Sequence, residues 1–218
     1  MKKLLLLSIL ALTMSCGKEN HTTIVNPIVT QSSEIPAVQV DIENLVADEN
    51  EYRVGQGQAP LSAGLSCALQ TFTVGERIQA SITVYNTLQG LTNVGAYTLK
   101  AAFNQQNSNA SDGLNILPTS MKNTYKTNYL LRCTGYVVVT ESDYYQFDLT
   151  SDDASILYIA GAKVIDNDNA HGVTLKTGTK FLRRGVHSFR LDYAQNGGAQ
   201  ALILNMNGEL LSKDRMVR

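Results

Sequence analysis

Two segments in the C-terminal half of the chain place an apolar side chain at every second position. They cover residues 144–149 and 187–193. Successive side chains of a β-strand point to opposite faces of a sheet, so this period predicts strands with one buried face rather than helices. From Asn128 onward, similar segments follow one another with short turns, which is typical of an all-β sandwich or barrel. The predicted buried rows are Tyr145, Phe147, Leu149, then His187, Phe189, Leu191, Tyr193, then Leu202, Leu204, Met206.

Earlier in the chain, three segments are rich in β-branched and aromatic residues, namely 68–74, 77–85 and 97–103. We predict that each forms a strand of the same domain. Residues 104–123 are polar and contain Gly113 and Pro118, which interrupt regular structure. We therefore predict a long loop there.

The segment from Ser151 to Gly172 combines adjacent aspartates, two short apolar runs and a loop rich in Asn, Asp and His. The first run, residues 156–159, suits a strand, and the Gly-containing turn at 160–162 reverses the chain before the second run. This pattern predicts a hairpin. Its geometry brings Asp152-Asp153 and residues 166–169 to the same end of the sheet.

The N-terminus carries an export signal. Two lysines precede an apolar run from Leu4 to Met14, which is too short to span a bilayer as an anchor. The sequence LTMSC resembles a bacterial lipoprotein cleavage site, so we predict a signal peptide over residues 1–15 and acylation of Cys16. An ordinary secretory signal cut nearby is the alternative. Because Gly17 follows the cysteine, we expect a lipid anchor in the outer membrane of the cell envelope, facing the surface or the periplasm.

Residues 16–60 are rich in Asn, Gln, Thr, Glu and Val, contain three of the four prolines, and show no sustained period. We predict a flexible tether there and a β-domain over residues 61–218. Ile42, Leu45 and Val46 have helical spacing, but the window is too short for a stable isolated helix. Any helix there would be marginal or docked on the domain.

The net charge limits the expected binding partners, and the cysteine content indicates the cellular compartment. The formal net charge of -1 gives no electrostatic footprint for nucleic acid, so we expect none as a partner and membrane contact only through the N-terminal lipid. With Cys16 used for lipid, Cys67 and Cys133 form an even pair in an exported chain, where disulfides persist. A disulfide between them is the simplest interpretation, and two separate buried thiols are the alternative. The histidines lack the cysteine spacing of a zinc site.

The order of motifs from Asn128 to Gly172 resembles that of the PA14 family of bacterial and fungal β-domains. Residues 181–208 resemble the family's closing hairpin, and the resemblance spans about residues 95–210. It implies a PA14-like antiparallel β-sandwich or barrel. The motifs that carry it are Arg132, Gly135-Tyr136, the strand 144–149, Ser151-Asp152-Asp153, the run 157–159, Gly161 and the run 164–166.

Oxygen-bearing side chains gather in two loops, which suits a hard cation such as Ca²⁺. The resemblance implies that Asp152 and Asp153, joined by a cis peptide, bind the ion together with an amide oxygen and two carbonyl oxygens of the second loop. These ligands map to Gln195, Gly197 and Ala199, and Asn196 is a rival for the amide because the alignment could shift by one residue. Alternatively, the two aspartates cap a β-turn and residues 196–198 merely reverse a hairpin.

PA14 adhesins bind glycans through a calcium ion that accepts two vicinal sugar hydroxyls, and the resemblance implies the same role here. Asp152 and Asp153 would then contact the sugar, and polar side chains at the rim would determine which sugars bind. Each rim residue is equally well explained as a solvated loop residue. The rim candidates are Asn167, Asn169, His171 and Asn196.

We expect no enzymatic activity. The chain contains no GxSxG, HExxH or P-loop pattern, and it is too short for a catalytic domain beside this one. His187 lies on a predicted apolar row, and His171 has no identifiable nucleophile beside it. The alternative to a cell-surface lectin or adhesin is a calcium-stabilised protein-interaction or structural module without sugar affinity.

Overall fold

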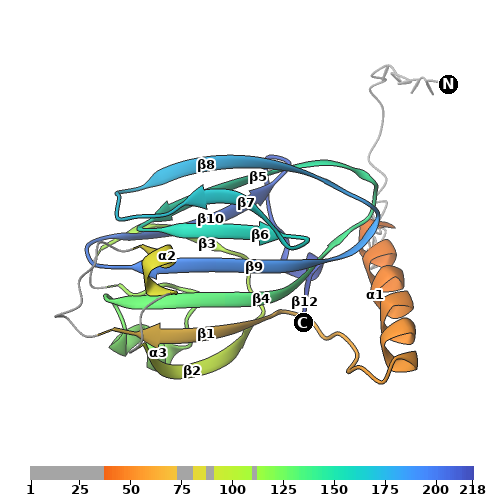
Figure 1. Cartoon of the computed structure of the whole chain (residues 1–218), viewed down its shortest axis with the longest axis horizontal. Coiled ribbons are helices and arrows are strands. Elements are labelled where there is room, and N and C mark those ends of the chain that lie inside the picture. The colour runs from red at the N-terminus through yellow and green to blue at the C-terminus, as the bar shows by residue number, and fades with distance from the viewer. Residues whose placement is uncertain (1–36, 73–80, 87–90, 110–111) are drawn as a thin grey trace, which may run out of the picture. The chain divides into compact units, whose positions relative to one another are not determined.

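The structure is a computed structural model that describes residues 37–72, 81–86, 91–109 and 112–218. Two antiparallel sheets pack against each other, which confirms the predicted sandwich; the described strands do not close into a barrel (Figure 1). No helix among the described residues is long and apolar enough to cross a membrane. The chain also forms helix α1 (Ala37–Gly55), two short helices, α2 (Ile82–Tyr85) and α3 (Thr119–Thr124), and the 3-10 turn η2 (Lys213–Arg215).

The larger sheet has the strand order β2-β1-β4-β9-β6-β7, with β12 beside β4, and the smaller sheet has the order β11-β10-β5-β8, with β3 beside β10. The strands of the larger sheet are β1 (Leu65–Thr71), β2 (Thr92–Leu99), β4 (Tyr129–Val139), β6 (Ser155–Ile159), β7 (Ala162–Asn167), β9 (Gly185–Gln195) and β12 (Met216–Val217). Those of the smaller sheet are β3 (Asn104–Ser108), β5 (Asp143–Asp152), β8 (Thr174–Leu182), β10 (Gln200–Met206) and β11 (Glu209–Leu210).

The core lies between the two sheets and is built from the alternating rows. Phe147 and Leu149 of β5 face Leu191 of β9 and their neighbours in one cluster of buried side chains. Burial along β5 alternates as the period of two predicts. The row in β9 is also confirmed from Phe189 to Tyr193. His187 is only half-buried at the start of β9, where its Nε2 lies 2.6 Å from the carbonyl oxygen of Arg183.

The hairpin predicted within Ser151–Gly172 is confirmed as β6 and β7, with residues 160 and 161 at the turn in left-handed conformations. Other local predictions are corrected. The segment 77–85, predicted as a strand, ends in helix α2, while residues 73–80 lie outside the described part. The polar loop predicted over 104–123 contains β3, which pairs with β10, and α3. Strand β3 and helix α2 depend on contacts with distant parts of the chain, which local composition does not reveal.

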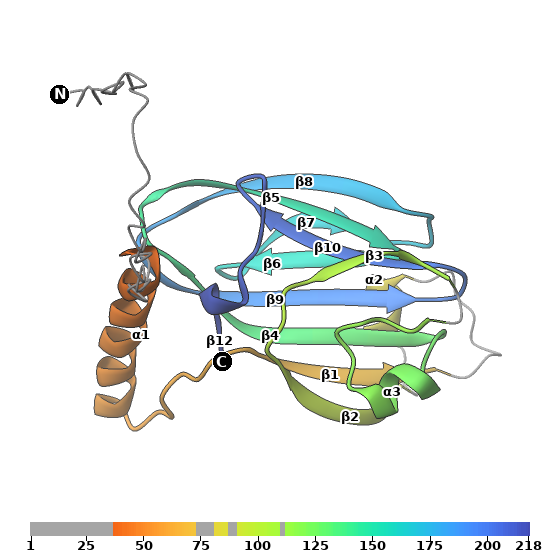
Figure 2. The ribbon, with the colours of Figure 1, turned by 180° about the vertical axis from the view of Figure 1, so that it is seen from behind.

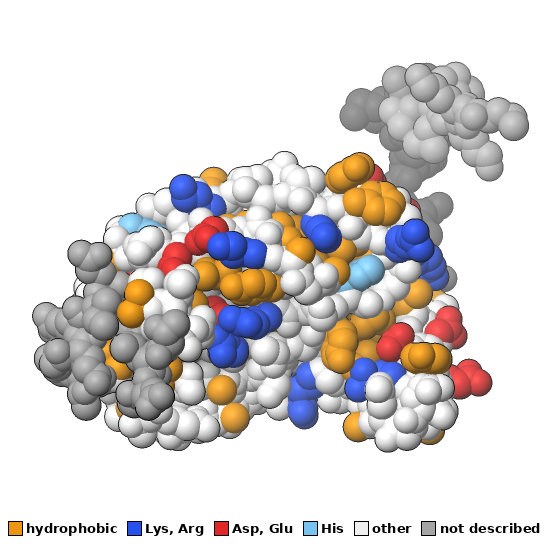
Figure 3. All heavy atoms as spheres, in the orientation of Figure 1, with side chains coloured by type: hydrophobic (Ala, Val, Ile, Leu, Met, Phe, Trp, Pro, Cys, Tyr) orange, Lys and Arg blue, Asp and Glu red, His pale blue; other side chains and the backbone are white. Residues whose placement is uncertain are grey.

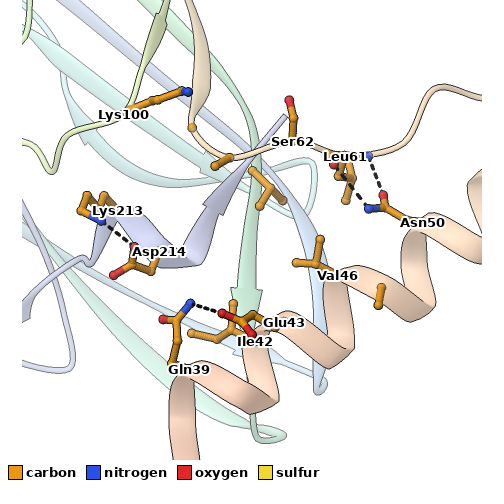
Figure 4. A pocket seen from close by; sticks show the side chains of 14 residues that line it. Gln39, Ile42, Glu43, Val46, Asn50, Leu61, Ser62, Lys100, Lys213 and Asp214 are labelled. Atoms are coloured by element: carbon orange, nitrogen blue, oxygen red, sulfur yellow. Dashed lines mark hydrogen bonds and ion pairs between the residues drawn. The ribbon is translucent and has the colours of Figure 1, made fainter. Parts of the chain in front are cut away.

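Residues 37–55 of the predicted tether form helix α1, the docked helix that the sequence analysis allowed for in this segment. Its Ile42 is buried in a small cluster with Leu61, Val138 and Val217, so the helix is docked on the outer face of the larger sheet. An open cavity of about 440 Å³ remains between α1 and the segment 61–64 (Figure 4). Residues 16–36, including Cys16, and the signal peptide predicted over 1–15 lie outside the described residues.

The two paired cysteines lie directly opposite each other on neighbouring strands. In the register of β1 with β4, Cys67 is the partner of Cys133, and the two sulfurs are joined in a disulfide. Both side chains are fully buried in the main core. The predicted pairing is confirmed, and it links strands whose cysteines are 66 positions apart in the sequence.

Candidate functional site

The two adjacent aspartates lie where β5 ends and the chain turns into β6. This is the end of the sandwich that lies away from α1 (Figures 1 and 2). The peptide bond between Asp152 and Asp153 is cis, as the family resemblance implies. Their side chains are mostly buried, with only 9% of Asp152 and 7% of Asp153 exposed. Neighbouring carboxylates are thus held together in a poorly solvated place.

Asp153 connects the two loops that the sequence singled out. Its Oδ1 accepts a hydrogen bond of 3.2 Å from the backbone N–H of His171, and its Oδ2 accepts one of 2.9 Å from the backbone N–H of Asn196. Its own backbone N–H donates to Oε1 of Gln195 at 3.2 Å. The loop after β7 and the loop after β9 therefore meet at the carboxylate that follows β5.

Asp152 is held by its backbone instead. Its carbonyl oxygen accepts a hydrogen bond of 2.5 Å from the hydroxyl of Tyr193, whereas its carboxylate accepts none from any described residue. Burial, and then the charge of Asp153, raise the pKa of Asp152, and the nearby His171 opposes the rise. The carboxylate of Asp152 is thus destabilised by its surroundings and lacks a protein donor within the described structure.

A comparison with a third buried carboxylate shows what this pair lacks. Asp192 is fully buried and forms ion pairs with Arg132 at 2.8 Å and Arg190 at 2.5 Å. Basic side chains are visible in the middle of the face viewed in Figure 3. Neither Asp152 nor Asp153 forms an ion pair with any described lysine or arginine. Buried charges are normally paired or bound to a metal. A bound cation would therefore neutralise the two carboxylates, which have no basic partner among the described residues.

The amide of Gln195 is engaged within the protein. The side chain is fully buried, and its Oε1 accepts a hydrogen bond from the Asp153 backbone N–H. Oε1 also lies 2.7 Å from the Tyr193 hydroxyl, whose single hydrogen is shared with the Asp152 carbonyl. The Nε2 donates to the Ala199 carbonyl at 3.1 Å. The side chain of the next residue, Asn196, is half-exposed and makes no hydrogen bond with any described residue. Gln195 therefore braces the loop, and Asn196 is the amide left open beside the aspartates.

Among the described residues, no three His, Cys, Asp or Glu side chains are grouped so that they could hold a metal ion by themselves. A cation at Asp152 and Asp153 would need amide and carbonyl oxygens as its further ligands. Gly197 and Ala199 supply carbonyls in the loop between β9 and β10. A Cβ built on Gly197 meets only the methyl of Thr127, at 3.9 Å, so the loop is not tightly enclosed at that point.

The predicted rim residues have different environments. Asn167 is only 2% exposed, and its amide donates to the Ser151 hydroxyl at 2.9 Å and the Thr174 carbonyl at 3.2 Å. It therefore supports the loop from inside, and the prediction that it lies at the rim is wrong. Asn169 is exposed in a left-handed conformation. The ring nitrogens of His171 lie near carbonyl oxygens, Nδ1 at 2.8 Å from that of Gly172 and Nε2 at 3.0 Å from that of Asn167.

Asp168 organises the surroundings of the site in a way that sequence reasoning missed. Its carboxylate accepts hydrogen bonds from the N–H of Ile82 at 2.7 Å, the hydroxyl of Thr83 at 2.7 Å and that of Ser81 at 3.1 Å, so it fixes the start of α2. Burial raises the pKa of Asp168, but these hydrogen bonds outweigh burial and leave it lowered. The only sequence signal is Ser81, a preferred residue at helix starts.

Comparison with known families identifies the fold. The PA14 domain family matches residues 80–213, which is more than half of the chain. The chain therefore belongs to the PA14 domain family, and the resemblance drawn from the motifs is confirmed. A search of curated protein sequences finds no match.

Several solved structures share the fold. A PA14 domain of the MpAFP antifreeze protein has a TM-score of 0.55 at 17% identity, covering 72% of this chain and 91% of that one. A PA14 sugar-binding domain from an RTX adhesin has a TM-score of 0.55 at 16% identity, covering 71% and 97%. An epithelial adhesin 9 A domain from Candida glabrata, in complex with Galβ1-3GlcNAc, has a TM-score of 0.52 at 13% identity, covering 72% and 89%.

A fourth similar structure is part of a longer protein. An anti-sigma factor domain-containing protein from Clostridium clariflavum has a TM-score of 0.52 at 18% identity, and the match covers 71% of this chain but only 47% of that one. The chain thus spans about half the length of that relative. At such identities these structures show a shared fold.

Proposed function

We propose that this PA14 domain is a cell-surface lectin or adhesin module that binds glycans through a calcium ion held by Asp152 and Asp153. The observation that carries the proposal is the pair of adjacent, mostly buried carboxylates without a basic ion-pair partner among the described residues. Removing two like charges from water is costly unless a cation balances them. A divalent cation would balance both.

The chemistry of the available donors favours calcium. A hard cation takes six to eight oxygen ligands from carboxylates, amides, carbonyls and water. The two aspartates provide carboxylates, and the loop after β9 provides the carbonyls of Gly197 and Ala199. We propose Asn196 as the amide ligand in place of Gln195, because the Gln195 amide already bonds Tyr193, Asp153 and Ala199.

A bound calcium ion would supply open coordination positions for two vicinal hydroxyls of a sugar. Asp152 and Asp153 would accept hydrogen bonds from those hydroxyls, while the exposed Asn169 and the half-buried His171 border the same loop and would contact the rest of the sugar. The descriptions of two solved relatives support this class of ligand, since one is called a sugar-binding domain and another was solved with a disaccharide. Binding of this kind involves no catalysis.

The decisive experiment compares glycan binding with and without free calcium. We expect the wild-type protein to bind glycans on an array in calcium and to lose them in excess EDTA. Asp153→Asn should abolish binding, because it removes one of two charges from the ion site while preserving the side-chain shape. Asp166→Asn is the matched control, since Asp166 is an exposed carboxylate in the same hairpin, paired with Lys163.

Two outcomes would contradict the proposal in different ways. Glycan binding that persists in EDTA would remove calcium from the mechanism. Calcium binding by a protein that retains no glycan on the array would favour the calcium-stabilised interaction module instead.

We propose further that the protein is exported and held at the outer membrane by lipid on Cys16. The basis is the charged start, the short apolar run and the LTMSC sequence. Labelled fatty acid should enter the wild-type protein in growing cells, and Cys16→Ser should prevent both labelling and retention in the membrane fraction. If Cys16→Ser is processed and fractionates like the wild type, the anchor is wrong.

A further inference from the structure

Two aromatic side chains are exposed together on the outer face of the smaller sheet. Tyr144 of β5 and Phe181 of β8 are direct partners in the strand register, and 69% of Tyr144 and 46% of Phe181 is exposed. Their ring centroids lie 5.3 Å apart with an interplanar angle of 64°. Exposing two large rings side by side forgoes the gain from burying them, which marks a candidate contact surface.

A row of hydrogen-bonding groups continues from this aromatic pair along the same face. Gln146 is the next outward residue of β5, and its Nε2 donates to Oδ1 of Asp148 at 3.0 Å. The hydroxyl of Thr177 on β8 donates to the same oxygen at 2.8 Å. These groups are thus oriented by one another, and Gln146 and Thr177 are open to solvent.

The same row leads to the candidate calcium site. Residues 144, 146, 148, 150 and 152 lie on one side of β5 because successive side chains alternate. At a rise of roughly 3.4 Å per residue, Tyr144 and Asp152 are about 27 Å apart along the strand. Figure 2 views the molecule from the side on which β8, β5, β10 and β3 lie in front. Tyr144 and Asp152 therefore lie at the two ends of the same side of β5.

We propose that this surface, formed by the outward residues of β5 and β8, binds a chain of neutral sugars that extends from the calcium site to the aromatic pair. The inference rests on the proposed function and specifies its ligand as an oligosaccharide. The C–H faces of sugar rings pack on the electron-rich faces of Tyr144 and Phe181. Hydroxyls along the chain exchange hydrogen bonds with Gln146, Asp148 and Thr177.

Charge favours a neutral ligand. Asp148 has no ion-pair partner among the described lysines and arginines, so a sugar acid or sulfated glycan lying on this row would be repelled. A calcium ion at the aspartates would coordinate neutral hydroxyl groups, so the ligand would not need a negative group.

The test measures affinity as a function of ligand length, with the full protein in calcium. The probes are linear cello-, malto- and galacto-oligosaccharides together with their parent monosaccharides. For the series that binds, we expect wild-type affinity to rise with length until the chain reaches the aromatic pair. The double variant Tyr144→Ala/Phe181→Ala should lose about tenfold in affinity for the longest member, since two aromatic faces no longer cover the sugar. It should leave monosaccharide and calcium affinity unchanged.

Tyr52→Ala is the matched control, because Tyr52 is an equally exposed aromatic residue on α1, and it should bind every length like the wild type. Single variants at Tyr144 and Phe181 should each show part of the loss, and far-UV circular dichroism verifies folding. Equal affinity of wild type and double variant for long oligosaccharides would overturn the inference, as would wild-type affinity independent of length. If the wild type binds no sugar in calcium, the proposed function fails as well.

Discussion

At the scale of single residues, the site depends on a hydrogen-bond network that positions the aspartates. The Tyr193 hydroxyl lies within hydrogen-bond distance of both the Asp152 carbonyl and Gln195 Oε1. A buried tyrosine needs such a partner, and here the partner is the loop that carries the candidate ligands. A tyrosine hydroxyl is protonated at neutral pH, and burial raises the pKa of Tyr193 further, so its hydroxyl remains a donor.

This network separates the roles of two neighbouring amides. Gln195→Ala should lower the free energy of unfolding by about 1–3 kcal/mol, because it leaves buried donors unsatisfied. Asn196→Ala should leave stability nearly unchanged and weaken calcium binding, because only an open oxygen is lost. Urea denaturation and calcium titration of both variants provide the measurement. The reverse result, with Asn196→Ala destabilised and Gln195→Ala impaired only in calcium binding, would return Gln195 to the ligand set.

The sequence indicated the candidate site, but it did not indicate the environment of every residue in it. The adjacent aspartates and the turn at residues 196–198 could be recognised because the motif is local. Asn167 is polar and lies in a loop, so nothing local revealed that its amide points inward. The role of Asp168 could not be predicted, since its partner Ile82 lies 86 positions earlier.

At the scale of elements, α1 shows how tertiary contacts can stabilise a helix that has a weak sequence signal. Its sequence has little amphipathic character, and most of the stability of helices in proteins comes from tertiary packing. The docked helix gains the buried Ile42, the Asp41–Arg184 ion pair and the contact of Arg53 with the Tyr136 ring. Exposed ion pairs contribute little, so the apolar contact should dominate.

Ile42→Ala should therefore release α1 from the domain. We expect a loss of about 2 kcal/mol from the docking free energy, at the lower end of such truncations because the cluster is small. Limited proteolysis should then cut within residues 37–55 faster than in the wild type. Val38→Ala, at an exposed position of the same helix, is the control and should not change the rate. Equal cleavage of Ile42→Ala and wild type would mean that other contacts hold the helix.

Elements with a strong internal pattern were predicted well, and short ones were not. The strands β5, β6, β7 and β9 have a period of two or a clear turn between apolar runs. In contrast, α2 depends on a cap from a distant loop, and β3 on pairing with β10. Both sequences are short: that of β3 is polar, and that of α2, ITVY, has the composition of a strand. Their structures are therefore determined by contacts with distant parts of the chain.

At the scale of the whole molecule, the sandwich provides a rigid support for loops from three parts of the sequence. β4 and β9 pair over their full lengths, and the disulfide joins β4 to β1. Closing a loop of this size stabilises a fold by about 4 kcal/mol in the chain-entropy treatment. Near the end of β9, the N–H of Ala194 donates to the carbonyl of Ala154 at 2.9 Å, and the N–H of Asn196 donates to the Asp153 carboxylate at 2.9 Å. These contacts keep the two candidate ligand loops together without the ion.

The central claim is that Asp152 and Asp153 together hold a calcium ion. Isothermal titration of calcium into the chelator-treated protein tests it most directly, with Asp152→Asn, Asp153→Asn and the control Asp166→Asn alongside. We predict one calcium ion per wild-type and control molecule, and a loss of about two orders of magnitude in affinity in each of the other variants, because each removes a charged ligand. Wild-type calcium affinity in both Asp152→Asn and Asp153→Asn would contradict the account.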